Sequence, residues 1–397
     1  MKVETISDIQ EYIHQSIDSI GGYWPPLSAV ARLLEEIGEL SYELKNITID
    51  PGNLKYELAD IFILTICISN QYSSHLLSEY EKLEIDIPRP RSTRSHFSKK
   101  KIKRALEILL EINMGAGMVA RIVNAYEGTK IPKEGEGMLT ISEASARLQK
   151  SLIDFAVLFS IDILLISKVV FDRKSSRDQN RFDKLFDPTL SYCLKDFQKL
   201  QKQTYCVYAS NAKLWGASKY NTKKGFEDNM FIYLQQLLRF TKIAPAEHLD
   251  GFIIELPTTK FGANLEMLAN TMNNVLRYLN KNDPKQSNCL DIEIESKSWQ
   301  FNFNGIDLFF VTFAPFYPDS NPRKSISDKT FIFVQLQQMF KEKIPRDRVT
   351  EVKKHIRTLF NNGNKDYDGI IMDNDFEAYK FVKPISLSGD AVKWWKM

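Results

Sequence analysis

Cysteine and histidine are scarce in this chain, and neither residue type is grouped. The 397 residues include 4 cysteines and 5 histidines. The cysteines show no C-x-x-C pairing and no zinc-ligand spacing, so the sequence indicates neither a zinc site nor a redox pair. We expect reduced thiols in a cytoplasmic protein. The four cysteines are Cys67, Cys193, Cys206 and Cys289.

A long apolar run without charge is also missing. The N-terminus reads Met-Lys-Val-Glu-Thr-Ile-Ser-Asp and has no apolar core of a secretory signal. The longest apolar stretch, Leu152–Phe171, contains Asp154, Asp162 and Lys168, which are costly in lipid. We therefore expect a buried helix over this stretch and no membrane partner.

Excess charge of one sign is small, because the net charge is only +3. Such a balance does not predict a polyanion bound over the whole surface. Positive charge nevertheless gathers in Arg89–Arg104, which has eight Lys or Arg and no acid. This segment is interpreted either as a solvated linker leading into a helix or as an electropositive flap near a phosphate site. Contact with nucleic acid is a further alternative.

Apolar residues follow helical spacing from residue 6 to about residue 185, and the character changes after Asp187-Pro188. Aromatic residues and short strand-like runs then alternate with helical patterns. We predict a multidomain protein with an all-α bundle over residues 1–190 and an α+β domain over residues 200–397. The predicted strands of the second domain are Gln203–Ala209, Gly251–Glu255, Gln300–Phe303, Leu308–Phe313 and Thr330–Leu336, and its helices are Glu227–Phe240, Asn264–Leu279 and Val349–Leu359.

The helical part contains an apparent internal repeat. Residues 105–183 repeat the helix-turn-helix layout of residues 20–75. Since one helical hairpin cannot bury its apolar face alone, the second would complete a bundle, and we expect a fused pseudo-dimer. The alternative is that any two helical hairpins look alike. In the alignment, Glu36, Glu39, Glu57 and Asp60 fall on Met114, Gly117, Ser151 and Asp154, so most acids are lost from the second copy.

Two pairs of acids are the strongest functional signal. Glu36-Ile-Gly-Glu39 and Glu57-Leu-Ala-Asp60 each place two carboxylates on one helix face. Two facing pairs form a four-carboxylate cage, which is costly without cations but suits Mg²⁺ or Mn²⁺. Paired acids are also common on solvated helices. The second pair, however, lies in an almost wholly apolar segment, where acids are usually partnered or ligated.

Other residues are candidates for activating water or binding substrate beside this cage. Glu35 could orient or deprotonate a water, and Trp24 is either a stacking surface for a base or a core aromatic. Basic residues of the second copy could neutralise a phosphate tail, although each alone is also a common surface residue. These basic residues are Lys168, Arg173, Lys174, Arg177 and Arg181.

The E-x-x-E, spacer, E-x-x-D pattern on helices resembles the all-α nucleoside triphosphate pyrophosphohydrolases of the MazG and dimeric dUTPase group. The resemblance covers roughly residues 20–183. It implies Mg²⁺-dependent cleavage of an NTP or dNTP to the monophosphate and pyrophosphate. It also implies that Glu36, Glu39, Glu57 and Asp60 are metal ligands and that Asn70 contacts the substrate. Because the second copy has lost its acids, a single site is expected.

The second half contains no Ser-His-Asp set and no P-loop. Its distinctive stretch is Trp299–Phe310, a predicted hairpin turning at Asn304-Gly305, followed by the Pro-bounded basic loop Pro315–Ser325. With Tyr205–Ala212 and Phe331–Phe340, this arrangement is similar to the YqcI/YcgG family over about residues 200–385. Some members are haem-dependent N-hydroxylases acting on guanidino groups.

That resemblance raises haem as a cofactor. Where members have a histidine as haem ligand, this chain has Tyr317, and tyrosinate ligates haem in some proteins. Without haem, Arg323 and Lys324 could bind an anionic ligand instead.

Three functional hypotheses follow from these patterns. The first is a Mg²⁺-dependent nucleotide pyrophosphohydrolase whose C-terminal domain senses or modifies a related compound. The second is a haem-dependent oxygenase with a non-catalytic helical module. The third is a non-catalytic nucleotide-binding regulator. A homo-oligomer is compatible with each.

Overall fold

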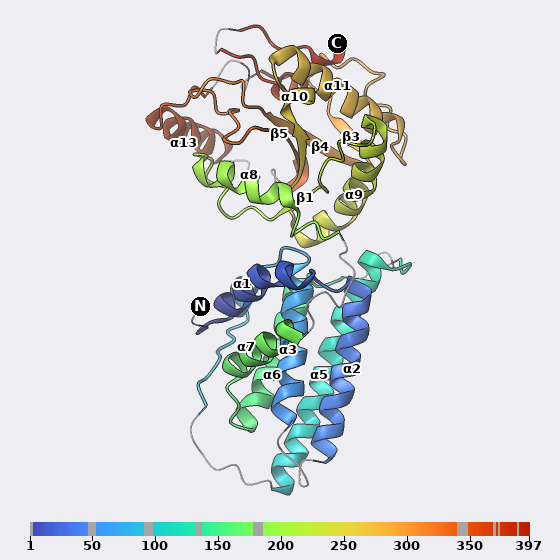
Figure 1. The fold of residues 1–397 in the computed structure, drawn as a ribbon, viewed down its shortest axis with the longest axis vertical. Helices are drawn as coiled ribbons and strands as arrows, with labels where there is room; N and C mark the ends of the chain where they lie inside the picture. Colours follow the sequence, from blue (N-terminus) through green and yellow to red (C-terminus); the bar gives the residue numbers. More distant parts are fainter. Residues whose placement is uncertain are drawn as a thin grey trace. The chain divides into compact units, whose positions relative to one another are not determined.

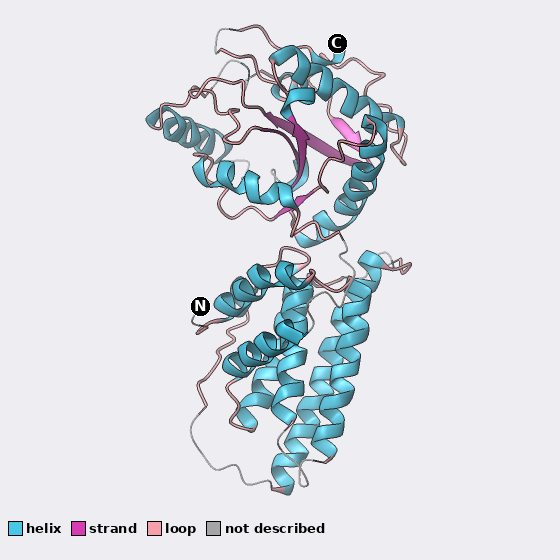
Figure 2. Ribbon diagram, viewed as in Figure 1, coloured by secondary structure: helices cyan, strands magenta, loops and turns pink. Residues whose placement is uncertain are grey.

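The computed structural model describes residues 3–46, 53–90, 98–131, 133, 137–177, 186–339, 348–367, 371, 374–386 and 389–397. These residues form two compact units, Met1–Asp187 and Pro188–Met397, called unit 1 and unit 2 below (Figure 1). Unit 1 is helical, and unit 2 combines helices with a mixed sheet (Figure 2). The prediction of a helical region followed by an α+β region is therefore confirmed.

Four long helices form the body of unit 1: α2 (Pro26–Lys45), α3 (Leu54–Asn70), α5 (Lys99–Glu127) and α6 (Ile141–Leu158). Helix α2 packs on α3 and α5, and α6 packs on the same two helices. Helix α3 is buried on all sides from Leu58 to Asn70, which places it at the centre of the bundle. An acid within this stretch of α3, such as Asp60, therefore has few routes to solvent.

The described residues of unit 1 also form α1 (Ile6–Ile17), α4 (Leu76–Lys82) and α7 (Ile163–Arg177), with the short turn η1 (Asp18–Ile20) after α1. Helices α1 and α7 pack on α3. The expectation of one helix over Leu152–Phe171 is wrong, because α6 ends at Leu158 and α7 begins at Ile163. Ser160, with a φ of 56°, turns the chain between them. No helix among the described residues is long and apolar enough to span a membrane.

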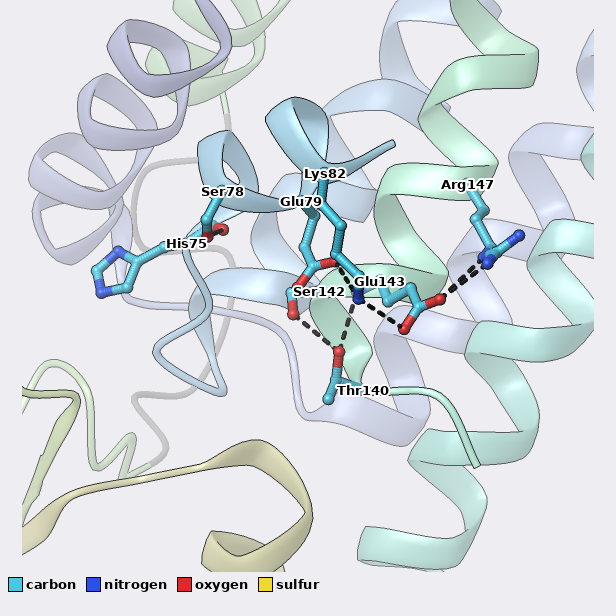
Figure 3. Close-up of polar contacts among 8 residues, drawn as sticks. All are labelled: His75, Ser78, Glu79, Lys82, Thr140, Ser142, Glu143 and Arg147. Atoms are coloured by element: carbon cyan, nitrogen blue, oxygen red, sulfur yellow. Dashed lines mark hydrogen bonds and ion pairs between the residues drawn. The ribbon is translucent and has the colours of Figure 1, made fainter. Parts of the chain in front are cut away.

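Charged side chains join α4 to the start of α6 (Figure 3). Lys82 Nζ lies 3.5 Å from a carboxylate oxygen of Glu79 and 3.5 Å from one of Glu143. The other oxygen of Glu143 accepts a 2.8 Å bond from Arg147. Thr140 caps α6 by accepting from the Glu143 backbone N–H at 3.1 Å. This cluster, Glu79, Lys82, Glu143 and Arg147, is a surface network of two acids and two bases.

Unit 2 is built on a five-stranded sheet of order β1-β2-β5-β4-β3 (Figure 2). Strands β1 and β2 are parallel, and the remaining neighbours are antiparallel. Asn304 and Gly305, with φ of 54° and 77°, form the β3–β4 turn that the sequence predicted. The strands are β1 (Leu214–Gly216), β2 (Gly251–Pro257), β3 (Phe301–Phe303), β4 (Ile306–Phe313) and β5 (Lys329–Leu336).

Helices cover both faces of this sheet. On one face, Phe197 of α8 packs edge-on against Phe313 and Phe331. On the other face, Phe240 of α9 lies against Trp215 and Phe252. Among its described residues, unit 2 has the helices α8 (Tyr192–Gln203), α9 (Phe226–Glu247), α10 (Thr258–Phe261), α11 (Leu265–Lys281) and α13 (Val349–Asn362), with the short turns η3 (Glu377–Lys380) and η4 (Trp394–Lys396).

The predicted elements of unit 2 occur, with one exception. The strand predicted at Gln203–Ala209 is wrong, since α8 ends at Gln203 and turns follow. The Ala209 N–H bonds the Cys206 carbonyl at 3.1 Å, so these groups are satisfied locally and no strand pairing is needed. The first strand is instead Leu214–Gly216, which is too short to give a sequence pattern.

A candidate metal centre in the helical unit

Helices α2 and α3 bring three predicted ligands together. One carboxylate oxygen each from Glu36, Glu39 and Glu57 lies within 4.8 Å of the other two. The three-residue spacing places Glu36 and Glu39 on one side of α2, and Glu57 is in the first turn of α3. In the part of the chain that the structure describes, this is the one cluster of three or more His, Cys, Asp and Glu side chains of this kind. We call it the carboxylate group.

Glu36 is the buried member of the group, with 1% of its surface exposed. Its Oε1 contacts Arg32 Nη2 and lies 3.8 Å from Lys174 Nζ. Its Oε2 has no hydrogen-bond partner among the described residues. Burial, followed by the nearby charge of Asp60, raises the pKa of Glu36 to about 8. Without a further cation, this carboxylate is therefore unstable in its charged form.

Asp60, the fourth predicted ligand, is not in the carboxylate group. Its Oδ2 lies 2.6 Å from Lys174 Nζ, and only 7% of the residue is exposed. Burial raises the pKa of Asp60, while the bond to Lys174 acts in the opposite direction. Burial also raises the pKa of Glu57. The structure thus places three predicted ligands in one cluster and the fourth on a lysine beside it.

The carboxylate group fits a hard divalent cation. Oxygen ligands of Mg²⁺ lie about 2.1 Å from the metal, so neighbouring ligands are about 3 Å apart and opposite ones about 4 Å apart. The three oxygens here lie within 4.8 Å of one another, which is compatible with such a geometry. The orphan Oε2 of Glu36 has a lone pair to donate. Burial decreases from Glu36 through Glu57 to Glu39, which is exposed. The open side suits the waters and phosphate oxygens that Mg²⁺ usually retains.

Glu35 lies outside the carboxylate group. Its side chain is 54% exposed and forms an ion pair with Arg32 Nη1. Arg32 thus contacts both Glu35 and Glu36, three and four residues further along α2. The sequence interpretation missed Arg32, although its i, i+3 and i, i+4 spacing to two glutamates was visible. The role of Glu35 as a base stays a prediction.

Among the predicted phosphate-binding cations, the structure places Lys174 on the acids. Arg173 lies instead over the Tyr56 ring, 4.9 Å from its centroid. Lys168 binds Asp172 at 2.6 Å and lies 4.7 Å from the centre of the Tyr12 ring. Arg177 is an exposed residue at the end of α7. Arg181 lies outside the described residues.

Two predicted substrate contacts lie away from the carboxylate group. Asn70 is ten residues beyond Asp60 on α3, about 15 Å along the helix. It is buried, accepts a 2.8 Å hydrogen bond from Gln10 and donates a 2.9 Å hydrogen bond to Tyr23 Oη. The Asn70 amide therefore forms hydrogen bonds within the core. Trp24 is 37% exposed and lies just before α2, more than two turns from Glu36.

In the predicted second copy, the positions aligned with the four acids retain one acid. Met114 on α5 is 72% exposed, and a Cβ added to Gly117 would meet no atom within 4 Å. Ser151 and Asp154 are half-buried on α6, where Asp154 is paired with Lys150 at 2.8 Å. The one remaining acid is therefore neutralised within its own helix.

The candidates of unit 2 are engaged in structural bonds. Tyr317 is fully buried and donates its hydroxyl to the Lys383 carbonyl at 2.7 Å, and burial raises its pKa. A tyrosinate ligand must be deprotonated, so this arrangement does not fit haem ligation. Arg323 is buried, donates to the Lys380 carbonyl at 3.1 Å, and has its pKa lowered to about 10 by burial. Lys324 donates to the Pro315 carbonyl at 2.8 Å.

Unit 2 also contains an acid in a cavity of 490 Å³ whose lining includes Arg277, Glu295 and Lys396. Glu295 binds Lys393 at 2.9 Å and Tyr379 Oη at 2.8 Å, and Lys396 lies 3.4 Å away. Lys393, then Tyr379, lowers the pKa of Glu295 to about 2. Its charge is satisfied by the chain itself.

Sequence reasoning missed a buried acid of β2. Glu255 is 6% exposed, lies 3.8 Å from Lys329, and has an Oε2 without a hydrogen-bond partner in the described structure. Burial raises its pKa. No second carboxylate joins it in a metal-sized cluster among the described residues, so it is not a comparable centre.

Comparison with known proteins finds a family match in the α+β unit. Residues 197–382 match the model of the YqcI/YcgG family, so the predicted resemblance of this half is confirmed. The chain is also similar to the protein described as "Uncharacterized protein YpjD" of Bacillus subtilis (strain 168). The two are 29% identical over 92 residues, which cover 21% of this chain and 83% of that protein. No solved structure matches the chain. The resemblance to the MazG group stays a prediction.

Proposed function

We propose that unit 1 is a metal-dependent nucleoside triphosphate pyrophosphohydrolase that converts an NTP or dNTP to the monophosphate and pyrophosphate. The observation that carries the proposal is the carboxylate group, with the buried, unpartnered Oε2 of Glu36. Burying several like charges is costly unless a ligand compensates them. The resemblance of the two acid pairs to the MazG group supports the same chemistry.

In this proposal the carboxylates of Glu36, Glu39 and Glu57 hold Mg²⁺ or Mn²⁺, with Asp60 beside them. When bound, the metal would polarise phosphate oxygens and lower the pKa of a coordinated water. The exposed side of the group, at Glu39, is where the triphosphate enters. Glu35 lies next to Glu36 on α2 and is the candidate for orienting the water.

We further propose that α2–α3 and α5–α6 are an active and an inactive copy of one hairpin. The packing is symmetrical in kind, because α2 lies on α5 and α3 lies on α6. The second hairpin has the same helical layout, and its Asp154 forms an ion pair with Lys150. A single active site is the consequence. Unit 2 would then sense or modify a related compound.

The test is pyrophosphate release from a panel of NTPs and dNTPs by the full chain with Mg²⁺ or Mn²⁺. We expect release with at least one nucleotide, and its loss with EDTA and in Glu39→Gln. The matched control is Asp154→Asn, which changes the acid of the second copy and should leave release intact. Absence of release with every nucleotide and both metals would refute the proposal, as would unchanged release by Glu39→Gln.

A further inference from the structure

Lys174 forms ion pairs with two of the four predicted metal ligands, Asp60 and Glu36. It is in the last turn of α7, and its Nζ lies 2.6 Å from Asp60 Oδ2 and 3.8 Å from Glu36 Oε1. Helix α7 packs along α3, so the fold itself delivers this ammonium to the acids. The Lys174 side chain is 27% exposed and thus has a path toward solvent.

Arg32 and Lys174 compensate these acids in different ways. Arg32 is on the same helix as Glu36 and is also held by Glu35, so its guanidinium is fixed on both sides. Lys174 comes from another helix on a flexible four-carbon stem and is held by Asp60 and, more loosely, Glu36. Of the two cations, Lys174 is the one that can leave without breaking contacts within α2.

The compensation that these two cations supply is incomplete. Glu36 Oε2 has no hydrogen-bond partner in the described structure. One ammonium also serves both Asp60 and Glu36, at unequal distances. A divalent ion would bind these oxygens more strongly than a single ammonium does, because it carries twice the charge at a shorter distance.

We propose that Lys174 is a built-in counter-ion that holds Asp60 in the metal-free protein and is displaced when metal binds. This inference rests on the proposed function. Displacement transfers Asp60 to the metal and turns the ammonium toward the entering phosphates. Two consequences follow. The metal must compete with Lys174, which weakens its binding to the free protein. Nucleotide relieves this competition by giving the ammonium a new partner, so metal and nucleotide bind cooperatively.

The neighbouring cations of α7 provide matched controls. Arg173 is adjacent in sequence but lies over the Tyr56 ring, and Lys168 is bound to Asp172. Both carry the same charge as Lys174 on the same helix, and in the described structure neither forms an ion pair with Asp60 or Glu36. A general electrostatic effect of α7 would appear in all three substitutions, whereas displacement concerns Lys174 alone.

The experiment measures Mn²⁺ binding to the full chain by electron paramagnetic resonance, with and without a non-hydrolysable nucleoside triphosphate. For Lys174→Met we expect about tenfold tighter Mn²⁺ binding without nucleotide, and loss of the affinity gain that nucleotide gives the wild type. Lys168→Met and Arg173→Met should bind Mn²⁺ as the wild type does. If Lys174→Met does not fold, Lys174→Gln replaces it, because it retains a hydrogen-bond donor for Asp60 without the charge.

The outcomes separate the two proposals. If the wild type binds Mn²⁺ and Lys174→Met binds it equally or more weakly, the counter-ion role is refuted and the metal centre stands. Equal tightening in all three variants also refutes it, because the effect would then be general. If the wild type binds no Mn²⁺ with or without nucleotide, both the metal centre and the counter-ion role are refuted.

Discussion

Glu36 of unit 1 and Glu295 of unit 2 both lie beside cations of the chain, and they differ in how far those cations satisfy them. Glu295 has two lysines and a tyrosine hydroxyl, and its pKa is lowered to about 2. Glu36 is buried, retains an orphan oxygen, and has its pKa raised to about 8. An acid that the chain fully compensates is stable without a ligand. An acid that it leaves short of partners is costly, and a bound cation repays that cost.

Glu255 shows that a single orphan oxygen is not enough to indicate a metal site. It is buried and under-compensated like Glu36, yet no other carboxylate converges on it among the described residues. The distinguishing property of unit 1 is therefore the convergence of Glu36, Glu39 and Glu57.

The largest expected effect is on catalysis. Glu57→Gln should lower kcat/KM for pyrophosphate release about 100-fold or more, because it removes an oxygen of the proposed metal ligands and leaves the fold intact. Glu295→Gln, the matched change at the compensated acid, should leave kcat/KM within about twofold. A coupled pyrophosphate assay with Mg²⁺ measures both. Equal losses of kcat/KM in the two variants would contradict the assignment of catalysis to the carboxylate group of unit 1.

The second prediction concerns stability without metal. Glu36→Gln should stabilise the protein by about 1 to 2 kcal/mol in EDTA at pH 8, because it removes a buried and poorly compensated charge. Glu295→Gln should shift stability in the opposite direction, since it leaves Lys393 and Lys396 without their shared partner. Urea unfolding followed by circular dichroism gives both values. Destabilisation by Glu36→Gln would show that its charge is adequately compensated.

The third prediction is the pH dependence of stability in EDTA. The pKa of Glu36 in the folded protein, about 8, lies above its ordinary value of 4.5. Its contribution is therefore present at low pH and is lost as pH rises from about 4.5 through 8. The pKa of Glu295, about 2, lies below 4.5, so its contribution is present above pH 4.5 and is lost toward pH 2.

Thermal melts at pH 5 and pH 8.5 measure the part of this dependence that is assigned to Glu36. Mg²⁺ should offset the loss at the higher pH, because it binds the ionised carboxylates. Glu36→Gln should flatten the profile between the two values. A profile unchanged by both Mg²⁺ and Glu36→Gln would exclude Glu36 as the titrating group.

The smallest effect is expected at the surface network of unit 1. Lys82→Met removes two contacts of 3.5 Å, to Glu79 and Glu143. Exposed ion pairs contribute little, so the free energy of unfolding should fall by no more than about 0.5 kcal/mol. The same urea experiment applies. A loss of several kcal/mol would show that this ion-pair network contributes substantially to the stability of unit 1.

The sequence predicted the parts of this centre that depend on local geometry. The i, i+3 spacing of Glu36 and Glu39 fixes their common side of α2, and the apolar run around Asp60 signals its burial. The hairpin at Asn304-Gly305 was likewise predictable, because only a few residue pairs adopt two positive φ angles. Local rules were sufficient in each case.

The remaining features depend on contacts between distant segments. Lys174 is far from Asp60 in sequence, and the packing of α7 on α3 decides that these two meet while Arg173 does not reach the acids. In unit 2, the bond from Tyr317 to the Lys383 carbonyl joins residues 66 positions apart. Strand β1 could not be anticipated, because its three residues are too few for periodicity. Long-range packing, which one sequence does not display, decided each of these.

Identification of the products by ³¹P NMR tests the central claim most directly. The full chain is incubated with Mg²⁺ and the best nucleotide of the panel, with Glu36→Gln as the control. We predict resonances of the nucleoside monophosphate and pyrophosphate from the wild type, and intact triphosphate from the variant. Nucleoside diphosphate with orthophosphate, or products that Glu36→Gln forms equally well, would contradict the assignment of this chemistry to the carboxylate group.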